Sequence, residues 1–268
     1  MTHFVILKND EELLGHEVPY LSAIGALIYL ANCIRPNIAF SVNLLARYSS
    51  APTRRHWNGI KHILRYLRGT TDMSLFYSRE SKQQLLGYAN AEYLSESYKG
   101  KSQTWYVFNY NGTIISWRSI KQTMVATSSN HSEILAIHEA SQTCGLPSIR
   151  GNATKLHEDN VACIAQIKGG FIKGDRTKHI SKFFYTHELR KKGEIDVQQI
   201  RSCNNLVDLF TKALPSTTLK KLRYDFGIRR LRDLPFEMGK LIIWIYCTLF
   251  SFVQVLSHWV LLARFLTR

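Results

Sequence analysis

The chain has 268 residues, enough for one large domain or two small ones. Its 35 lysine and arginine residues outnumber 20 acidic residues, giving a formal net charge of +15, which is typical of proteins that meet a polyanion or an anionic membrane, although many soluble proteins are simply basic. The five cysteines form no C-x-x-C pair, which argues against a zinc site and a disulfide framework.

Residues 1–17 are expected to form an N-terminal tail and not a signal peptide. A signal peptide needs an uninterrupted apolar segment, and this stretch is interrupted by charges at Lys8, Asp10, Glu11 and Glu12. Together with the cysteine pattern, this predicts a reducing compartment, cytoplasmic or nuclear.

Residues 18–80 have the pattern of a small helical segment. Two apolar helical stretches in 20–48 are divided at Pro36, because proline cannot continue the first helix and suits the start of the second. A third helix is predicted over 53–68, with apolar residues at helical spacing. Its basic side chains face either solvent or phosphate, two readings that the sequence leaves open. They are Arg54, Arg55, Lys61, Arg65 and Arg68.

From residue 84 the pattern changes to short strands. Strand-like runs lie at 84–89, 104–109 and 113–118, and Asn111-Gly112 is a hairpin signal between the last two. Helical and strand-like segments then alternate. This order predicts an α/β fold with one mixed sheet flanked by helices, packed separately from the helical segment.

The last segment, 236–268, is strongly apolar. Between Leu241 and Ala263 it contains no Asp, Glu, Lys or Arg, and this length spans a bilayer core of ~30 Å at ~1.5 Å per residue. We expect a long apolar C-terminal helix there. It is either a transmembrane helix, which would make the protein membrane-associated, or an overhanging tail without function.

Three acids follow or begin the predicted elements of the sheet. Glu133 lies in the first turn of a helix, Asp159 directly follows a strand, and Asp208 lies in a helix after the next strand. Such acids can converge at one edge of an α/β sheet, where clustered carboxylates imply a cation, and oxygen ligands favour magnesium or manganese. Taken singly, each acid is more typical of a helix cap or a surface charge than of a metal ligand.

The motifs GYANAEY, VATSSNHSEILAI, HEDNVACIAQI, DRTKHIS and NNLVDLFTKALP occur in this order. The chain thereby resembles the C-terminal part of copia-type LTR retrotransposon Pol polyproteins. Residues 18–80 resemble the end of the reverse transcriptase, and the ribonuclease H-like domain would occupy 84–235. The resemblance implies a ribonuclease H-like mixed five-stranded sheet that cleaves RNA in RNA–DNA hybrids with two Mg²⁺ or Mn²⁺ ions.

Carried over by motif, Glu133, Asp159 and Asp208 match three of the family's catalytic acids and metal ligands. The first acid falls on Asn90, whose uncharged amide presents N–H donors where a cation should sit. Glu92 shares the strand face, but it starts ~6–7 Å further along, so we do not expect it to replace the acid. The resemblance therefore implies cleavage that is weak or absent.

Other positions also depart from the family. Trp105 stands where the family has glycine, and the 26-residue spacer from Glu133 to Asp159 is short. The Asp-Asp motif of the reverse transcriptase is absent, so no DNA polymerisation is expected. In DRTKHIS, three residues are assigned to nucleic-acid contact: Arg176, Lys178 and His179.

Three functions stay open on the sequence. The chain is an impaired ribonuclease H, a non-catalytic nucleic-acid-binding remnant, or a membrane-anchored protein. Asn90 separates the first two, and residues 241–263 bear on the third.

Overall fold

The computed structural model describes residues 13–15, 17–77, 84–96, 100–144, 153–170, 180–208 and 215–233. In chain order its helices are α1 (Tyr20–Cys33), α2 (Ala39–Ala46), α3 (Arg54–Arg68), α4 (Ser129–Cys144), α5 (Val161–Gly169), α6 (Ile180–Lys191) and α8 (Ser216–Asp225). Its strands are β1 (Met73–Leu75), β2 (Leu85–Glu96), β3 (Lys101–Tyr110), β4 (Thr113–Lys121), β5 (Thr154–Glu158), β6 (Ile195–Gln199) and β7 (Ile228–Arg230). Short 3₁₀ helices lie at Pro36–Ile38, Ser202–Asn204 and Leu231–Asp233.

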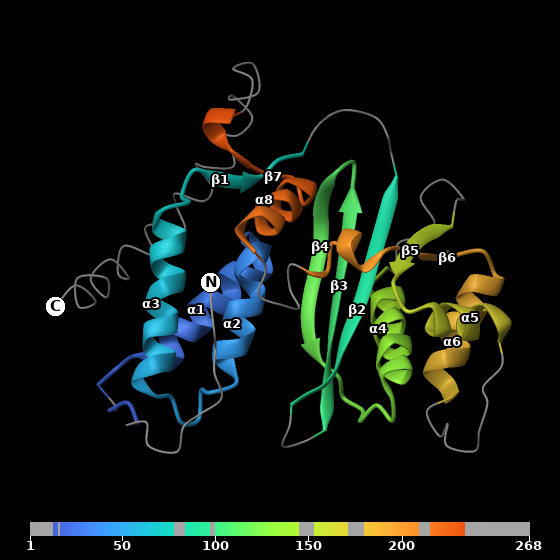
Figure 1. Ribbon diagram of the computed structural model, residues 1–268, viewed down its shortest axis with the longest axis horizontal. Helices are drawn as coiled ribbons and strands as arrows, with labels where there is room; N and C mark the ends of the chain where they lie inside the picture. Colours follow the sequence, from blue (N-terminus) through green and yellow to red (C-terminus); the bar gives the residue numbers. More distant parts are fainter. Residues whose placement is uncertain are drawn as a thin grey trace.

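The central sheet has five strands in the order β4-β3-β2-β5-β6 (Figure 1). β2, β3 and β4 are antiparallel, whereas β5 and β6 run parallel to β2. Asn111 and Gly112 close the β3–β4 hairpin with positive φ values of 53° and 79°, as a tight two-residue turn requires. This confirms the prediction of a mixed five-stranded sheet flanked by helices.

The sheet is buried on both faces because β3 alternates its side chains between two cores. Tyr106 and Phe108 pack in one core with α4, α5 and α6. Trp105 and Val107 pack in the other core with α1, α2, α3 and α8. Figure 1 shows α1–α3 and α8 on one side of the sheet and α5 and α6 on the other.

The helices before the sheet share their core with it. Trp57 of α3 and Trp105 of β3 belong to the same apolar cluster, and Trp117 Nε1 of β4 donates a 2.7 Å hydrogen bond to the carbonyl oxygen of Ala31. The division into a helical part and a sheet part stays a prediction. Hydrogen exchange tests it, because two domains would open separately and one cooperative unit would open together.

The prediction of a long apolar C-terminal helix was wrong as a part of the fold. The last described element ends at Asp233, and residues 234–268, with the run 241–263, lie outside the described residues. Among the helices that the structure describes, none has the length and apolar character needed to cross a membrane. An apolar run alone does not decide a helix, because most helical stability comes from what packs against the apolar face.

Arg35, between α1 and α2, forms hydrogen bonds to the segment after α3 and to the first residue of β1. Pro36 divides α1 from α2 as predicted. The Arg35 side chain is 8% exposed, and its Nη1 donates to the carbonyl oxygens of Thr70 at 3.0 Å and Met73 at 2.8 Å. Two buried acceptors therefore depend on one charged donor.

We expect Arg35→Ala to lower the free energy of unfolding by about 2–3 kcal/mol, because it leaves two buried carbonyl groups without their charged partner. Urea denaturation measures the change. Arg54→Ala is the matched control, since Arg54 is exposed on α3, and should change stability by less than about 0.5 kcal/mol. Equal effects of the two variants would contradict the structural role of Arg35.

Candidate functional site

Three carboxylates meet where β5 ends and α4 begins. One oxygen each of Glu133, Glu158 and Asp159 lies within 4.8 Å of the others. Glu133 is on α4, Glu158 is the last residue of β5, and Asp159 follows it directly. Glu158 is fully buried and Glu133 is 7% exposed, whereas Asp159 is half-buried. The group is therefore a buried acidic cluster with one member near solvent.

Glu133 is placed by the start of α4. The helix is capped by Ser128, whose Oγ accepts a 3.1 Å hydrogen bond from the backbone N–H of His131. The helix then packs against β2, where the backbone N–H of Ala91 interacts with the Glu133 carboxyl group. The short spacer between Glu133 and Asp159 does not prevent the two acids from meeting.

Glu158 is placed by the alternation of β5. Thr154, Leu156 and Glu158 are the buried positions of the strand, and Leu156 belongs to the core beneath α4. Glu158 Oε1 accepts a 3.1 Å hydrogen bond from the backbone N–H of Asn160, whereas Oε2 is buried without a hydrogen-bond partner among the described residues. Asn160 in turn caps α5 by accepting from the backbone N–H of Cys163 at 3.0 Å.

Burial and mutual repulsion favour the neutral forms of these acids. Burial, followed by the nearby Asp159 carboxylate, raises the pKa of Glu133 to about 8, against the opposing effect of the Ala91 N–H. Burial, and next the charge of Glu133, also raises the pKa of Glu158 well above its ordinary value. Burial first, and then Glu158, raises the pKa of the Cys163 thiol. A positive charge in the cluster would relieve this repulsion.

We expect the free energy of unfolding, measured in EDTA, to fall between about pH 5 and about pH 9. Between the ordinary glutamate pKa of 4.5 and about 8, the folded state keeps a proton on Glu133 that the unfolded state has lost. The stabilisation is thus full below pH 4.5 and lost as the pH rises through about 8, at up to ~1.4 kcal/mol per pH unit for each such group. Urea denaturation at several pH values measures this slope, and Glu133→Gln should flatten it. A slope that Glu133→Gln leaves unchanged would contradict the placement of Glu133.

Asn90 lies on β2 between Ala89 and Ala91, whose backbone groups contact the segments that carry Asp208 and Glu133. On one side, Ala91 interacts with Glu133; on the other, Asn205 Nδ2 donates to the carbonyl oxygen of Ala89 at 3.4 Å. Asn205 also accepts the backbone N–H of Asp208 at 3.1 Å through its carbonyl oxygen. Asp208 is buried, but its carboxylate is not among the three that lie within 4.8 Å of one another.

The strand register pairs Asn90 with Trp105 of β3, so both side chains face the core shared with α1–α3. Trp105 is 2% exposed, and its large ring therefore stands directly opposite Asn90. Glu92, two residues along the same face, is exposed and lies outside the acidic cluster.

The sequence brought Glu133 and Asp159 forward as candidates but missed Glu158. The signal was available, because an acid at an inward position of an alternating strand is unusual and needs a partner. Arg176, Lys178 and His179, assigned to nucleic-acid contact, lie outside the described residues. Their role stays a prediction, as does the catalytic role of Asn90, Glu133, Asp159 and Asp208.

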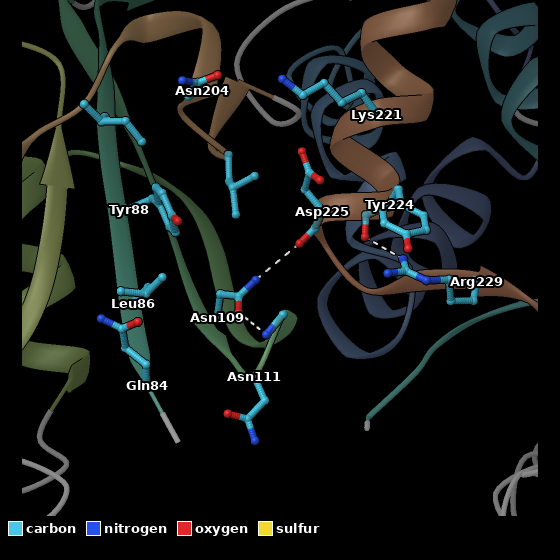
Figure 2. A pocket seen from close by; sticks show the side chains of 13 residues that line it. Gln84, Leu86, Tyr88, Asn109, Asn111, Asn204, Lys221, Tyr224, Asp225 and Arg229 are labelled. Carbon is cyan, nitrogen blue, oxygen red and sulfur yellow. Dashed lines mark hydrogen bonds between the residues drawn. The ribbon is translucent and has the colours of Figure 1, made fainter. Parts of the chain in front are cut away.

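A separate hollow of about 560 Å³ lies between the sheet and α8 (Figure 2). Tyr88 of β2 and Asn109 of β3 line it on one side, and Lys221 and Asp225 of α8 line it on the other. Asn109 Nδ2 donates to the carbonyl oxygen of Asp225 at 3.3 Å across this space. No member of the acidic cluster lines the hollow, so it is distinct from the candidate site.

No family model matches the chain. Similar solved structures include a ribonuclease H1 from Halobacterium salinarum, 13% identical with a TM-score of 0.35 over 46% of this chain and 90% of that one. A foamy viral protease-reverse transcriptase in complex with dsDNA is 12% identical, with a TM-score of 0.46 over 73% of this chain and 40% of that one. Likenesses of this size say nothing about the chemistry of the site.

Curated relatives are more similar in sequence. The Pol polyprotein from transposon TNT 1-94 of Nicotiana tabacum is 34% identical over 206 residues, which is 74% of this chain and 15% of the polyprotein. The polyprotein from transposon RE2 of Arabidopsis thaliana is 28% identical over 218 residues, again 15% of its length. A Plasmopara viticola protein named Secreted RxLR effector protein 161 is 39% identical over 138 residues, 97% of that protein and 52% of this chain.

The matches to the polyproteins cover about three quarters of the chain. The chain spans only about 15% of the length of these polyproteins. The chain is thus homologous, over about three quarters of its length, to copia-type retrotransposon Pol polyproteins.

Proposed function

We propose that the chain is a retrotransposon-derived ribonuclease H-like protein that binds RNA–DNA hybrids and cleaves their RNA weakly or not at all. The observation that carries the proposal is a buried cluster of three carboxylates at the end of β5, with Asn90 and not an acid on the neighbouring strand β2. The cluster retains acids suited to phosphodiester chemistry, while the neighbouring strand presents an amide. This arrangement favours binding over efficient cleavage.

The acids present suit a divalent cation. Oxygen-only donor sets favour Mg²⁺ or Mn²⁺, and Glu133 has a buried Oε2 without a hydrogen-bond partner among the described residues. Glu133 and Asp159 would hold such an ion, which in this chemistry activates water and stabilises the leaving oxygen of a phosphodiester. On β2, Asn90 offers a neutral oxygen and N–H donors, so it adds no negative charge to hold a second ion.

Nucleic-acid binding is supported by charge. The chain carries a formal net charge of +15, and α3 exposes Arg54, Arg65 and Arg68. Contacts to phosphates supply affinity without reading sequence, and the affinity they give falls steeply as salt concentration rises. Binding should therefore survive the loss of the carboxylate at Asn90.

The test uses the purified full chain with a labelled RNA–DNA hybrid, and with duplex DNA and single-stranded RNA of the same sequence. We expect salt-dependent binding of the hybrid, with RNA cleavage in Mg²⁺ close to the background without protein. Robust Mg²⁺-dependent cleavage by the unmodified chain would refute the impairment. Absence of hybrid binding at low salt would refute the nucleic-acid function altogether.

A further inference from the structure

We propose that Glu158 completes, with Glu133 and Asp159, a binding site for one divalent cation on the α4 side of the sheet. In this way the chain supplies from β5 a carboxylate at a position that the family resemblance does not assign. The inference rests on the proposed function only in treating the cluster as the remaining active site. Cation binding itself requires no nucleic acid.

Glu158 presents one anchored carboxylate oxygen and one without a hydrogen-bond partner among the described residues. It is fully buried; Oε1 accepts the backbone N–H of Asn160 at 3.1 Å, and the carboxyl group also interacts with the side chain of Asp159. Oε2 is buried and lacks a hydrogen-bond partner among the described residues. One oxygen is thus anchored, so the carboxylate is held in one orientation while the other oxygen is available to a ligand.

Glu133 also has one buried carboxylate oxygen without a partner among the residues that the structure describes. Its Oε2 is also buried without a hydrogen-bond partner in the described part of the chain, and its carboxylate lies within 4.8 Å of those of Glu158 and Asp159. Burying two carboxylate oxygens without hydrogen-bond partners in one acidic cluster destabilises the folded state unless a positive charge binds between them. Asp159 is only half-buried, so an ion can reach the group from solvent.

The register of the sheet separates this site from Asn90. β2 and β5 pair in parallel through Gly87 with Leu156 and Tyr88 with His157, so one further step brings Ala89 beside Glu158. Ala89 belongs to the core under α4, whereas Asn90 faces the opposite core with Trp105. Glu158 therefore adds a ligand on the α4 face and leaves the amide at Asn90 uncompensated. We therefore expect the cluster to bind one ion and not two.

The test measures Mn²⁺ binding to the full chain without nucleic acid, using the electron paramagnetic resonance signal of free Mn²⁺. We expect wild type to bind one Mn²⁺ and Glu158→Gln to bind it at least tenfold more weakly. Glu139→Gln is the matched control, because Glu139 also lies on the α4 side but pairs with Lys182 at 3.1 Å outside the cluster. It should bind Mn²⁺ like wild type.

A second variant keeps the test decisive if the amide disturbs folding. Glu158→Asp retains the charge and should bind Mn²⁺ more tightly than Glu158→Gln; circular dichroism in EDTA compares the folded fractions. Wild-type affinity in folded Glu158→Gln, or no Mn²⁺ bound by wild type, would overturn the inference. Mn²⁺ binding that needs Glu158 in a chain that binds no hybrid would refute only the proposed function.

Discussion

Asn90→Asp is expected to raise the rate of Mg²⁺-dependent cleavage of an RNA–DNA hybrid by on the order of a thousandfold. The substitution adds a negative charge on β2 between the backbone groups that contact the segments of Glu133 and Asp208. In two-metal displacement each ion stabilises charge by several kcal/mol, and each ~1.4 kcal/mol is a factor of ten in rate. Glu133 already lies beside Asp159, so the substitution tests whether the missing charge on β2 limits the reaction.

Single-turnover cleavage of a labelled hybrid, with enzyme in excess, measures this rate. Asn58→Asp is the control for net charge, because Asn58 is exposed on α3, and it should leave cleavage at the wild-type level. Asn90→Leu, which removes the amide oxygen, should stay at background. If Asn90→Asp binds the hybrid like wild type and still does not cleave it, the lost acid is not what limits the reaction.

Trp105→Gly should cost about 4–6 kcal/mol of unfolding free energy. Trp105 is 2% exposed in the core that joins β3 to α1–α3, and its removal leaves a cavity the size of an indole. Truncation of a buried tryptophan to alanine typically costs about 3–5 kcal/mol, and glycine inside a strand adds about 0.5–1 kcal/mol. A loss of this size is comparable to the whole stability of a marginal domain.

Urea denaturation followed by circular dichroism measures the cost. Tyr93→Gly is the matched control, since Tyr93 is a 36% exposed aromatic residue on the paired strand β2, and it should cost about 1 kcal/mol. If both variants lost similar amounts of unfolding free energy, the indole of Trp105 would have no special role in stabilising the shared core. The expected difference would mean that the fold depends on the buried indole of Trp105.

The sequence by itself determined the features that depend on local pattern. Asn111-Gly112 predicted the hairpin because only a few residue pairs adopt positive φ at both turn positions. Pro36 predicted the break between α1 and α2 because proline lacks an N–H and fixes φ. The motifs around Glu133 and Asp159 predicted their meeting through resemblance, and the structure places them within 4.8 Å.

Only the tertiary structure decided which other side chains join them. Glu158 enters the cluster because β5 alternates toward α4, and Asp208 remains outside its 4.8 Å group. Asn90 faces Trp105 because of the β2–β3 register, and a one-residue slip would reverse both faces. The period of the apolar residues and the secondary-structure propensity determine which face of a helix or strand is buried. Which buried faces contact one another depends on strand register and on packing among segments far apart in the chain.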